Sequence, residues 1–405
     1  MEFTTFTLAN GIRCIHRRVH SGVVHCALVV NAGSRDELPT EHGVAHLAEH
    51  TLFKGTLRRK AYQINSRLEK LGGELNAFTT KEDTTIHATT LRSDFAKAVD
   101  LIADVVFHST FPSHEVEREK KVVIDEINTY RDLPAESIFD EFEALLFPAS
   151  SLGRPILGTR RSVGSLGSEQ IRNFLERTYT TDQMVFSSIG PMSEETVRRT
   201  AERFLGTLPV SKRSFERTAP EATTPFFKQT HKLGNHQGHC IVGGRAFGFD
   251  DKRRLPLAML VNLLGGPSAN ARLNVLLRER NGLSYNIEAA YVPFTDTGEA
   301  TIYFSSEKEQ VDRCLELVQE ELHRAMEKLL SSRQLAQAKK QFLGQFAISM
   351  ESNEGYMLGA GKSFLVYNEV DTLKEVCRKV HEVTAEELAE VARTVFAEPS
   401  VLIYR

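Results

Sequence analysis

The sequence predicts an α+β protein built from two related halves, each an antiparallel sheet backed by helices. Short apolar, β-branched runs stand beside longer amphipathic segments, and the order of these segments occurs twice. In the first half the run 23–30 leads to Gly33-Ser34-Arg35, and in the second half the run 240–242 leads to Gly243-Gly244-Arg245. Strands paired locally with helices grouped against them are typical of the α+β class.

In the first half, turn and cap residues delimit the elements. Asn10-Gly11 is a turn, Gly55 suits the left-handed cap of the helix before it, and Gly72-Gly73 ends the next helix. The predicted helices cover 43–54, 62–71, 113–130 and 135–147, and the predicted strands cover 12–15, 23–30, 74–78, 84–91 and 185–189.

A similar order follows a polar segment at 209–224, which is rich in Lys, Ser, Pro and Thr and indicates a linker. We therefore expect an N-terminal domain at 1–212 and a C-terminal domain at 213–405. The predicted strands of the second domain cover 240–242, 285–291 and 299–304, and its predicted helices cover 255–264, 271–280, 311–330 and 332–347.

Composition excludes several classes of protein. The 405 residues carry a net charge of -3, which argues against a nucleic-acid partner, and no apolar run is long enough to span a membrane. The polar N-terminus does not resemble a secretory signal. The five cysteines are scattered and odd in number, which favours reduced thiols and a cytoplasmic location.

The pentapeptide His46-Leu47-Ala48-Glu49-His50 carries the strongest chemical signal. On a helix, His46 and His50 lie one turn apart on the same face, so both imidazoles can bind a single Zn²⁺. A catalytic zinc lowers the pKa of a bound water, and Glu49 is placed to take its proton. This order of residues is the inverted zinc signature of peptidases. The alternative is a chance match on a polar helix face.

Zinc needs a third protein ligand, and the acidic helix at 113–130 offers several carboxylates. Glu119 and Glu126 are one heptad apart and share a face, beside the apolar Val123 and Ile127. Solvated helix charges are the usual role of glutamate, so the residues alone leave the choice open. The candidates are Glu115, Glu117, Glu119, Asp125 and Glu126.

Several separated motifs resemble the inverted-motif zinc peptidases of the pitrilysin and mitochondrial-processing-peptidase type, in their short-subunit form. The similarity covers nearly the whole chain, and its motifs are highly specific. They are Gly33-Ser34-Arg35, the stretch 42–50, Phe53-Lys54-Gly55-Thr56, the stretch 73–79, Leu264-Gly265-Gly266 and the stretch 277–285. The resemblance implies that one chain forms half of a clam-shell and that two chains enclose a peptide chamber.

The resemblance also implies roles for individual residues. It selects Glu126 as the third zinc ligand, and Glu119 then becomes a candidate to hydrogen-bond a zinc-binding histidine and fix its ring. Residues 74–78 read as a short strand suited to pairing with an extended substrate, with Asn76, Ala77 and Phe78 as the binding residues.

The second domain is expected to complete the active site of a partner chain. Arg278 ends a predicted helix and Tyr285 begins a strand, so both could stabilise an oxyanion, as an arginine and a tyrosine with this spacing do in the family. Taken alone, they would more often be a helix-end cation and a half-buried strand residue. Because the chain contains both, we expect a homodimer.

The sequence therefore predicts a zinc metalloendopeptidase that cleaves short or unfolded peptides in an enclosed dimer chamber. A non-catalytic subunit is the competing class, but such relatives lose motif residues, whereas His46, Glu49, His50 and Glu126 are all present. A subunit of a heteromeric processing peptidase that needs a different partner chain is the third alternative.

Overall fold

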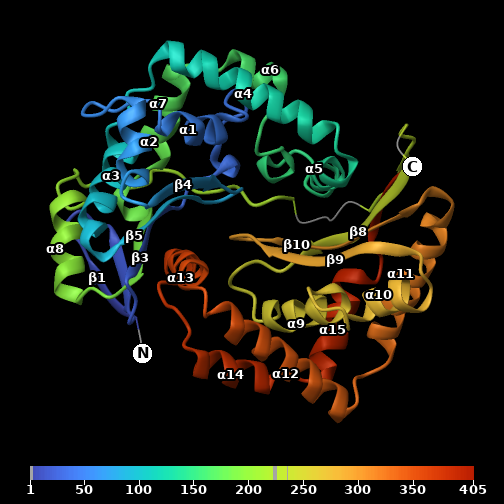
Figure 1. Ribbon diagram of the computed structural model, residues 1–405. Coiled ribbons are helices and arrows are strands. Elements are labelled where there is room, and N and C mark those ends of the chain that lie inside the picture. Colours follow the sequence, from blue (N-terminus) through green and yellow to red (C-terminus); the bar gives the residue numbers. More distant parts are fainter. Residues whose placement is uncertain (1–2, 222–225, 235) are drawn as a thin grey trace. The chain divides into compact units, whose positions relative to one another are not determined.

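The computed structural model describes residues 3–221, 226–234 and 236–405, and the chain forms two compact units (Figure 1). The first unit comprises Met1–Asn128, Arg154–Thr218 and Ile348–Thr372. The second comprises Thr129–Gly153, Ala219–Ala347 and Leu373–Arg405. Each unit is discontinuous in sequence, and the predicted domain boundary after residue 212 stays a prediction.

The first unit is organised around a six-stranded sheet in the order β1-β2-β6-β3-β5-β4. Every neighbouring pair is antiparallel except β2 and β6, which run parallel. Strand β4 pairs only with β5 and forms one edge. The strands are β1 (Thr4–Thr7), β2 (Arg13–Arg18), β3 (Val23–Val30), β4 (Glu74–Thr79), β5 (Thr84–Leu91) and β6 (Met184–Gly190).

Helices cover both faces of this sheet, which explains why β3 and β6 are buried on both sides. The large core lies on one face, against most of the helices of the unit (Figure 1). On the other face, α13 (Asn353–Tyr367) packs on β3 and β6, where the Ser187 hydroxyl donates to the Met357 carbonyl at 2.9 Å. The helices on the first face are α1 (Val44–Leu52), α2 (Ala61–Glu69), α3 (Phe95–Phe107), α4 (Ser113–Arg131), α7 (Ser168–Thr178) and α8 (Glu194–Phe204), and the short α6 covers Arg160–Ser165.

The second unit is organised around a five-stranded sheet in the order β7-β11-β8-β10-β9, in which only β7 and β11 run parallel. Its main core lies between this sheet and helices that include α9, α11 and α15, and a smaller core lies under α5. The strands are β7 (Lys228–His231), β8 (Gln237–Ala246), β9 (Ser284–Pro293), β10 (Gly298–Glu307) and β11 (Ser400–Tyr404). The helices are α5 (Pro134–Leu146), α9 (Arg254–Gly265), α10 (Arg272–Asn274), α11 (Val311–Glu327), α12 (Ser332–Ser349), α14 (Leu373–Glu382) and α15 (Ala385–Phe396).

The predicted fold class, α+β with two related helix-backed sheets, is confirmed. Two details differ. Each sheet is mixed rather than purely antiparallel. In each sheet one pair of neighbouring strands runs parallel, and the two strands of that pair are distant in sequence. The helix predicted at 271–280 is α10 followed by the π-helix η5 (Val275–Arg280), whose wider turns are common at functional sites.

The first part of the predicted linker is fastened to the first unit. Arg217 binds the Asp36 carboxylate at 2.8 Å, and both side chains are buried. Arg35 in turn donates to the Thr218 carbonyl at 3.0 Å. Residues 209–221 form no helix or strand, and the remainder of the predicted linker, 222–225, lies outside the described residues.

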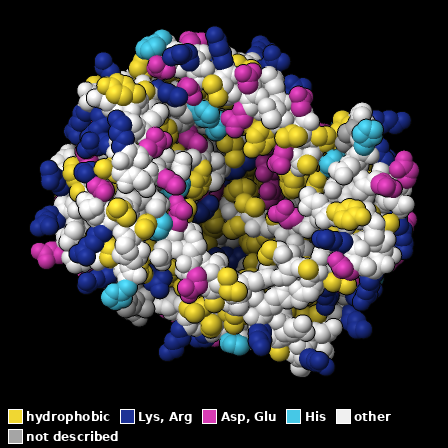
Figure 2. Space-filling view, in the orientation of Figure 1, with side chains coloured by type: hydrophobic (Ala, Val, Ile, Leu, Met, Phe, Trp, Pro, Cys, Tyr) yellow, Lys and Arg dark blue, Asp and Glu magenta, His cyan; other side chains and the backbone are white. Residues whose placement is uncertain are grey.

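Both signs of charge are mixed around the face of the protein that Figure 2 presents. Across the described residues, no helix is both long and apolar enough to cross a bilayer.

Candidate metal centre

Helix α1 carries the zinc signature, and tight packing defines where it begins. Gly43 precedes α1 with a φ of 91°, and a Cβ there would lie 2.9 Å from the Leu157 carbonyl oxygen. The backbone N–H groups of Gly43 and Ala45 both donate to the Glu37 carboxyl at 2.9 Å. Glu37 thus supplies acceptors to the free N–H groups at the helix start, although burial raises its pKa to about 8.

The side chains of His46, His50 and Glu126 converge across α1 and α4, with ligand atoms within 4.8 Å of one another. The Glu126 Oε2 atom lies 3.8 Å from the Nε2 atom of His46 and 3.6 Å from that of His50. Ligand atoms around a tetrahedral zinc with bonds near 2 Å are about 3.3 Å apart. Two imidazoles and one carboxylate are also a donor set found in catalytic zinc sites, so the three residues fit zinc.

Burial keeps His46 in the form that binds a metal. Desolvation, followed by the proximity of His50, lowers the pKa of His46 to about 3. Its imidazole is therefore neutral at neutral pH, the form that binds metals. The two rings are 4.6 Å apart at an interplanar angle of 66°.

Glu119 contacts the imidazole of His50 at the ring nitrogen that faces away from Glu126. Its Oε2 atom lies 3.3 Å from His50 Nδ1, on the opposite side of the ring from the nitrogen that faces Glu126. Its Oε1 atom binds Lys54 Nζ at 2.8 Å. A carboxylate on the outer nitrogen of a ligand histidine orients the ring and raises its basicity.

Glu119→Gln is expected to weaken zinc binding by about 10- to 100-fold, because the amide loses the charge that orients His50 and pairs with Lys54. The measurement is a competition titration against a fluorescent zinc chelator. Glu115→Gln is the matched control, because Glu115 lies one turn earlier on α4 and pairs with the exposed Arg118 instead. Equal zinc affinity in the two variants would contradict this assignment of Glu119.

Glu49 lies on α1 between the two histidines, and its Oε2 atom is buried without a hydrogen-bond partner among the described residues. Burial raises the pKa of Glu49, and hydrogen bonding to Thr79 opposes this shift. An unpartnered carboxylate oxygen beside a metal-type cluster is available to accept a proton from a bound water.

Thr79 is the last residue of β4, so the edge strand ends beside Glu49. Along this strand Asn76 and Phe78 are exposed and Ala77 is half-buried. The strand predicted at 74–78 is present and lies at the edge of its sheet, and the substrate-binding roles of the three residues stay predictions.

Arg278 and Tyr285 belong to the second unit. Arg278 lies in η5, where its guanidinium is 3.7 Å from the Glu279 carboxylate, and Tyr285 lies on β9 with 82% of its surface exposed. The Leu283 N–H donates to the Leu277 carbonyl at 2.8 Å and closes the turn between η5 and β9. Both residues stay candidates for substrate contact.

Sequence reasoning missed three residues that support the centre: Glu37, Lys54 and Thr79. Lys54 follows His50 by four residues, a spacing that could have suggested a cation beside the site. Thr79 and Glu37 carry no such local signal, because their partners are brought to them by the fold.

A mixed sheet backed by helices, with an inverted zinc signature facing a glutamate on a second helix, is the arrangement expected of a family of metallopeptidases. The chain matches the family model described as insulinase (peptidase family M16) at residues 16–160, and the model of the peptidase M16 inactive domain at residues 165–342. It belongs to peptidase family M16, which confirms the family predicted from the sequence.

Curated relatives align over almost the whole chain. One is a Bacillus subtilis protein named uncharacterized zinc protease YmxG, 32% identical over 98% of this chain and 96% of that protein. Another, uncharacterized zinc protease SCO5738 of Streptomyces coelicolor, is 30% identical over 98% of this chain and 88% of that protein.

Solved structures share the fold. A Pseudomonas fluorescens structure described as a peptidase M16 inactive domain has a TM-score of 0.92 at 19% identity, covering 100% of this chain and 98% of that one. A protease from Helicobacter pylori has a TM-score of 0.91 at 18% identity, covering 100% of this chain and 99% of that one.

Proposed function

We propose that this protein is a zinc-dependent endopeptidase that hydrolyses short or unfolded peptides in an enclosed chamber formed by two chains. The observation that carries the proposal is the cluster of His46, His50 and Glu126, with the Glu49 carboxylate beside it on the same helix. Two curated relatives are named uncharacterized zinc proteases, and these names support the proposal.

His46, His50 and Glu126 would hold the zinc, which when bound acts as a Lewis acid on a water and a peptide carbonyl. Glu49 accepts the proton of the attacking water on its unpartnered Oε2 atom and passes it to the leaving amine. Glu119 keeps the His50 ring oriented during this exchange.

The exposed edge of β4 is the proposed binding site for the peptide backbone. Its unpaired N–H and C=O groups can extend the sheet by one substrate strand, which selects extended chains over folded ones. Asn76 and Phe78 would contact the substrate beside Ala77, and the strand ends at Thr79 near Glu49.

Arg278 and Tyr285 are proposed to stabilise the tetrahedral oxyanion in the active site of the partner chain. The exposure of Tyr285 leaves its hydroxyl available for such a contact. We place the enzyme in the cytoplasm, because all five cysteines are free and four of them are buried.

Removal and restoration of zinc test the proposed activity. The purified chain is expected to contain about one zinc per chain and to cleave a quenched unstructured peptide. Dialysis against a chelator should abolish cleavage, and stoichiometric zinc should restore it. Bound zinc without cleavage would contradict a self-sufficient enzyme and favour the alternative, a non-catalytic or partner-dependent subunit of a heteromeric processing peptidase.

Mixing two inactive variants tests whether two chains share each active site. Glu49→Gln lacks the base and Tyr285→Phe lacks the oxyanion donor, so each homodimer is inactive. In a mixed dimer one site combines Glu49 of one chain with Tyr285 of the other. Random exchange at equal concentrations should therefore restore about a quarter of the wild-type rate. No restoration, with subunit exchange verified by differently tagged chains, would contradict the shared site.

A further inference from the structure

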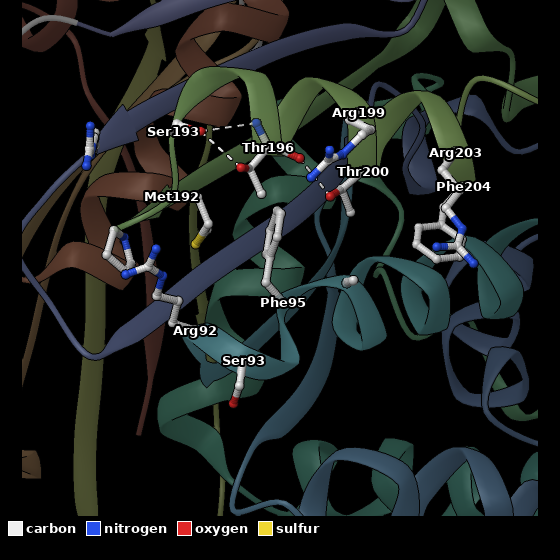
Figure 3. A pocket seen from close by; sticks show the side chains of 13 residues that line it. Arg92, Ser93, Phe95, Met192, Ser193, Thr196, Arg199, Thr200, Arg203 and Phe204 are labelled. Carbon is white, nitrogen blue, oxygen red and sulfur yellow. Dashed lines mark hydrogen bonds between the residues drawn. The ribbon is translucent and has the colours of Figure 1, made fainter.

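The first unit contains a cavity of about 390 Å³ that takes no part in the metal centre. It lies between the end of β2, the start of α3 with the turn before it, and α8 with the loop that precedes it (Figure 3). None of its lining residues belongs to α1 or α4. Its volume is within the range of small-molecule binding sites, so the cavity suits a small ligand rather than a folded protein.

Four arginines line this cavity: Arg18, Arg92, Arg199 and Arg203. No aspartate or glutamate lines it. Among the described residues none of the four has a carboxylate partner, whereas Arg198, their neighbour on α8, pairs with Glu194 at 3.0 Å. Four unneutralised guanidinium groups around one concave surface create a positive potential that favours an anion.

The arginines come from three different elements, which is unlike the single exposed face of a solvated helix. Arg18 ends β2, and Arg92 lies in the turn before α3. Arg199 and Arg203 are four residues apart on α8 and so point to the same side of that helix. All four side chains are exposed at the rim of the cavity. From these positions their guanidinium groups can donate to a bound phosphate, which accepts bidentate hydrogen bonds from arginine.

The floor of the cavity is apolar. Phe95 and Met192 are both 3% exposed, and in Figure 3 they lie between Arg92 and Arg199. The Arg203 guanidinium lies 5.0 Å from the centroid of the Phe204 ring, a flat surface against which an aromatic group can stack. The floor suits an apolar or aromatic body attached to the anion.

The hydroxyl groups that line the cavity are already engaged. The Ser93 hydroxyl donates to the Asp94 carboxylate at 3.1 Å, and the others bond within α8 or at its N-cap. Ser193 accepts the Thr196 N–H at 3.3 Å, and the Thr200 hydroxyl donates to the Thr196 carbonyl at 2.7 Å. The free hydrogen-bonding capacity of the cavity therefore resides mainly in the arginines.

We infer that this cavity binds a small organic phosphate, a ligand that joins two or more negative charges to an aromatic or apolar body, as nucleoside phosphates do. The arginines bind the phosphate oxygens, and Phe95, Met192 and Phe204 contact the body of the ligand. The inference does not depend on the zinc chemistry, and its failure would leave the proposed peptidase function untouched.

The test is isothermal titration of the full-length protein with ADP, adenosine and pyrophosphate at 150 mM salt, about physiological ionic strength. ADP is expected to bind, and adenosine and pyrophosphate to bind at least about tenfold more weakly, because each lacks one half of the recognition. The double variant Arg92→Gln/Arg199→Gln should weaken ADP binding at least about tenfold.

Two further variants make the result specific. Arg172→Gln removes the same type of charge from an exposed position on α7 outside the cavity and should bind ADP like the wild type. Because this control retains the metal centre, it also accounts for any binding of ADP to zinc. Ala96→Trp leaves every charge in place but fills part of the cavity from an exposed position of α3, and it should weaken ADP binding as well.

Three results would overturn the inference: no ADP binding by the wild type, equal ADP binding by the double variant and Arg172→Gln, or pyrophosphate binding as tight as ADP. Melting curves of all variants establish that they are folded.

Discussion

Replacement of Glu49 by glutamine is expected to reduce peptide cleavage by about 10²- to 10⁴-fold while zinc remains bound. The amide has nearly the same size and still accepts a hydrogen bond at one oxygen, but it cannot take a proton from water. Glu49 is not one of the three side chains whose ligand atoms converge, so the metal ligands stay intact. The measurement is the initial rate on a quenched peptide, with zinc content determined on the same sample.

Glu69→Gln is the matched control, since Glu69 is an exposed glutamate at the end of α2, and this variant should cleave at the wild-type rate. A Glu49→Gln protein that holds zinc and remains active would rule out Glu49 as the base. Loss of zinc together with activity would instead indicate that Glu49 helps to bind the metal.

Replacement of Glu126 by glutamine is expected to weaken zinc binding by more than about 100-fold and to abolish cleavage at low zinc. Loss of a carboxylate that merely supports a ligand costs 10- to 100-fold, so loss of a ligand should cost more. Glu126 is the only acidic residue among the three converging side chains, and the other two are imidazoles. Zinc per chain after gel filtration in zinc-free buffer, and a competition titration, measure the effect.

Asp125→Asn removes a carboxylate one residue away on the same helix, where the side chain is exposed, and should retain full zinc occupancy. Equal occupancy in the Glu126 and Asp125 variants would exclude Glu126 as a ligand. Partial activity of Glu126→Gln at high zinc would agree with the proposal, because mass action can refill a weakened site.

Features that depend on residues close together in sequence were predictable. His46, Glu49 and His50 share one face of α1 because a helix repeats every 3.6 residues, and this holds wherever the helix lies. The same reasoning located α4 and placed Glu119 and Glu126 on one face of it. The structure shows that this face meets His50 on α1.

The choice among the acidic residues of α4 could not be made from that helix alone. Glu115 and Glu117 form ion pairs with neighbours on α4 itself, and only the packing of α4 against α1 distinguishes them from Glu119 and Glu126. The resemblance to known peptidases, rather than the spacing, directed the prediction to Glu126.

The sequence by itself determined the zinc signature, the alternation of strands and helices, and the family, because each depends on the spacing of residues that are close together in the chain. The tertiary structure alone decided that β2 and β6 run parallel, that α13 covers the first sheet and α5 the second, and that Thr79 lies beside Glu49. It also decided that four arginines from three elements surround one cavity. These contacts join residues far apart in the chain, and the burial of apolar surface that brings them together leaves no periodic signal in the residues themselves.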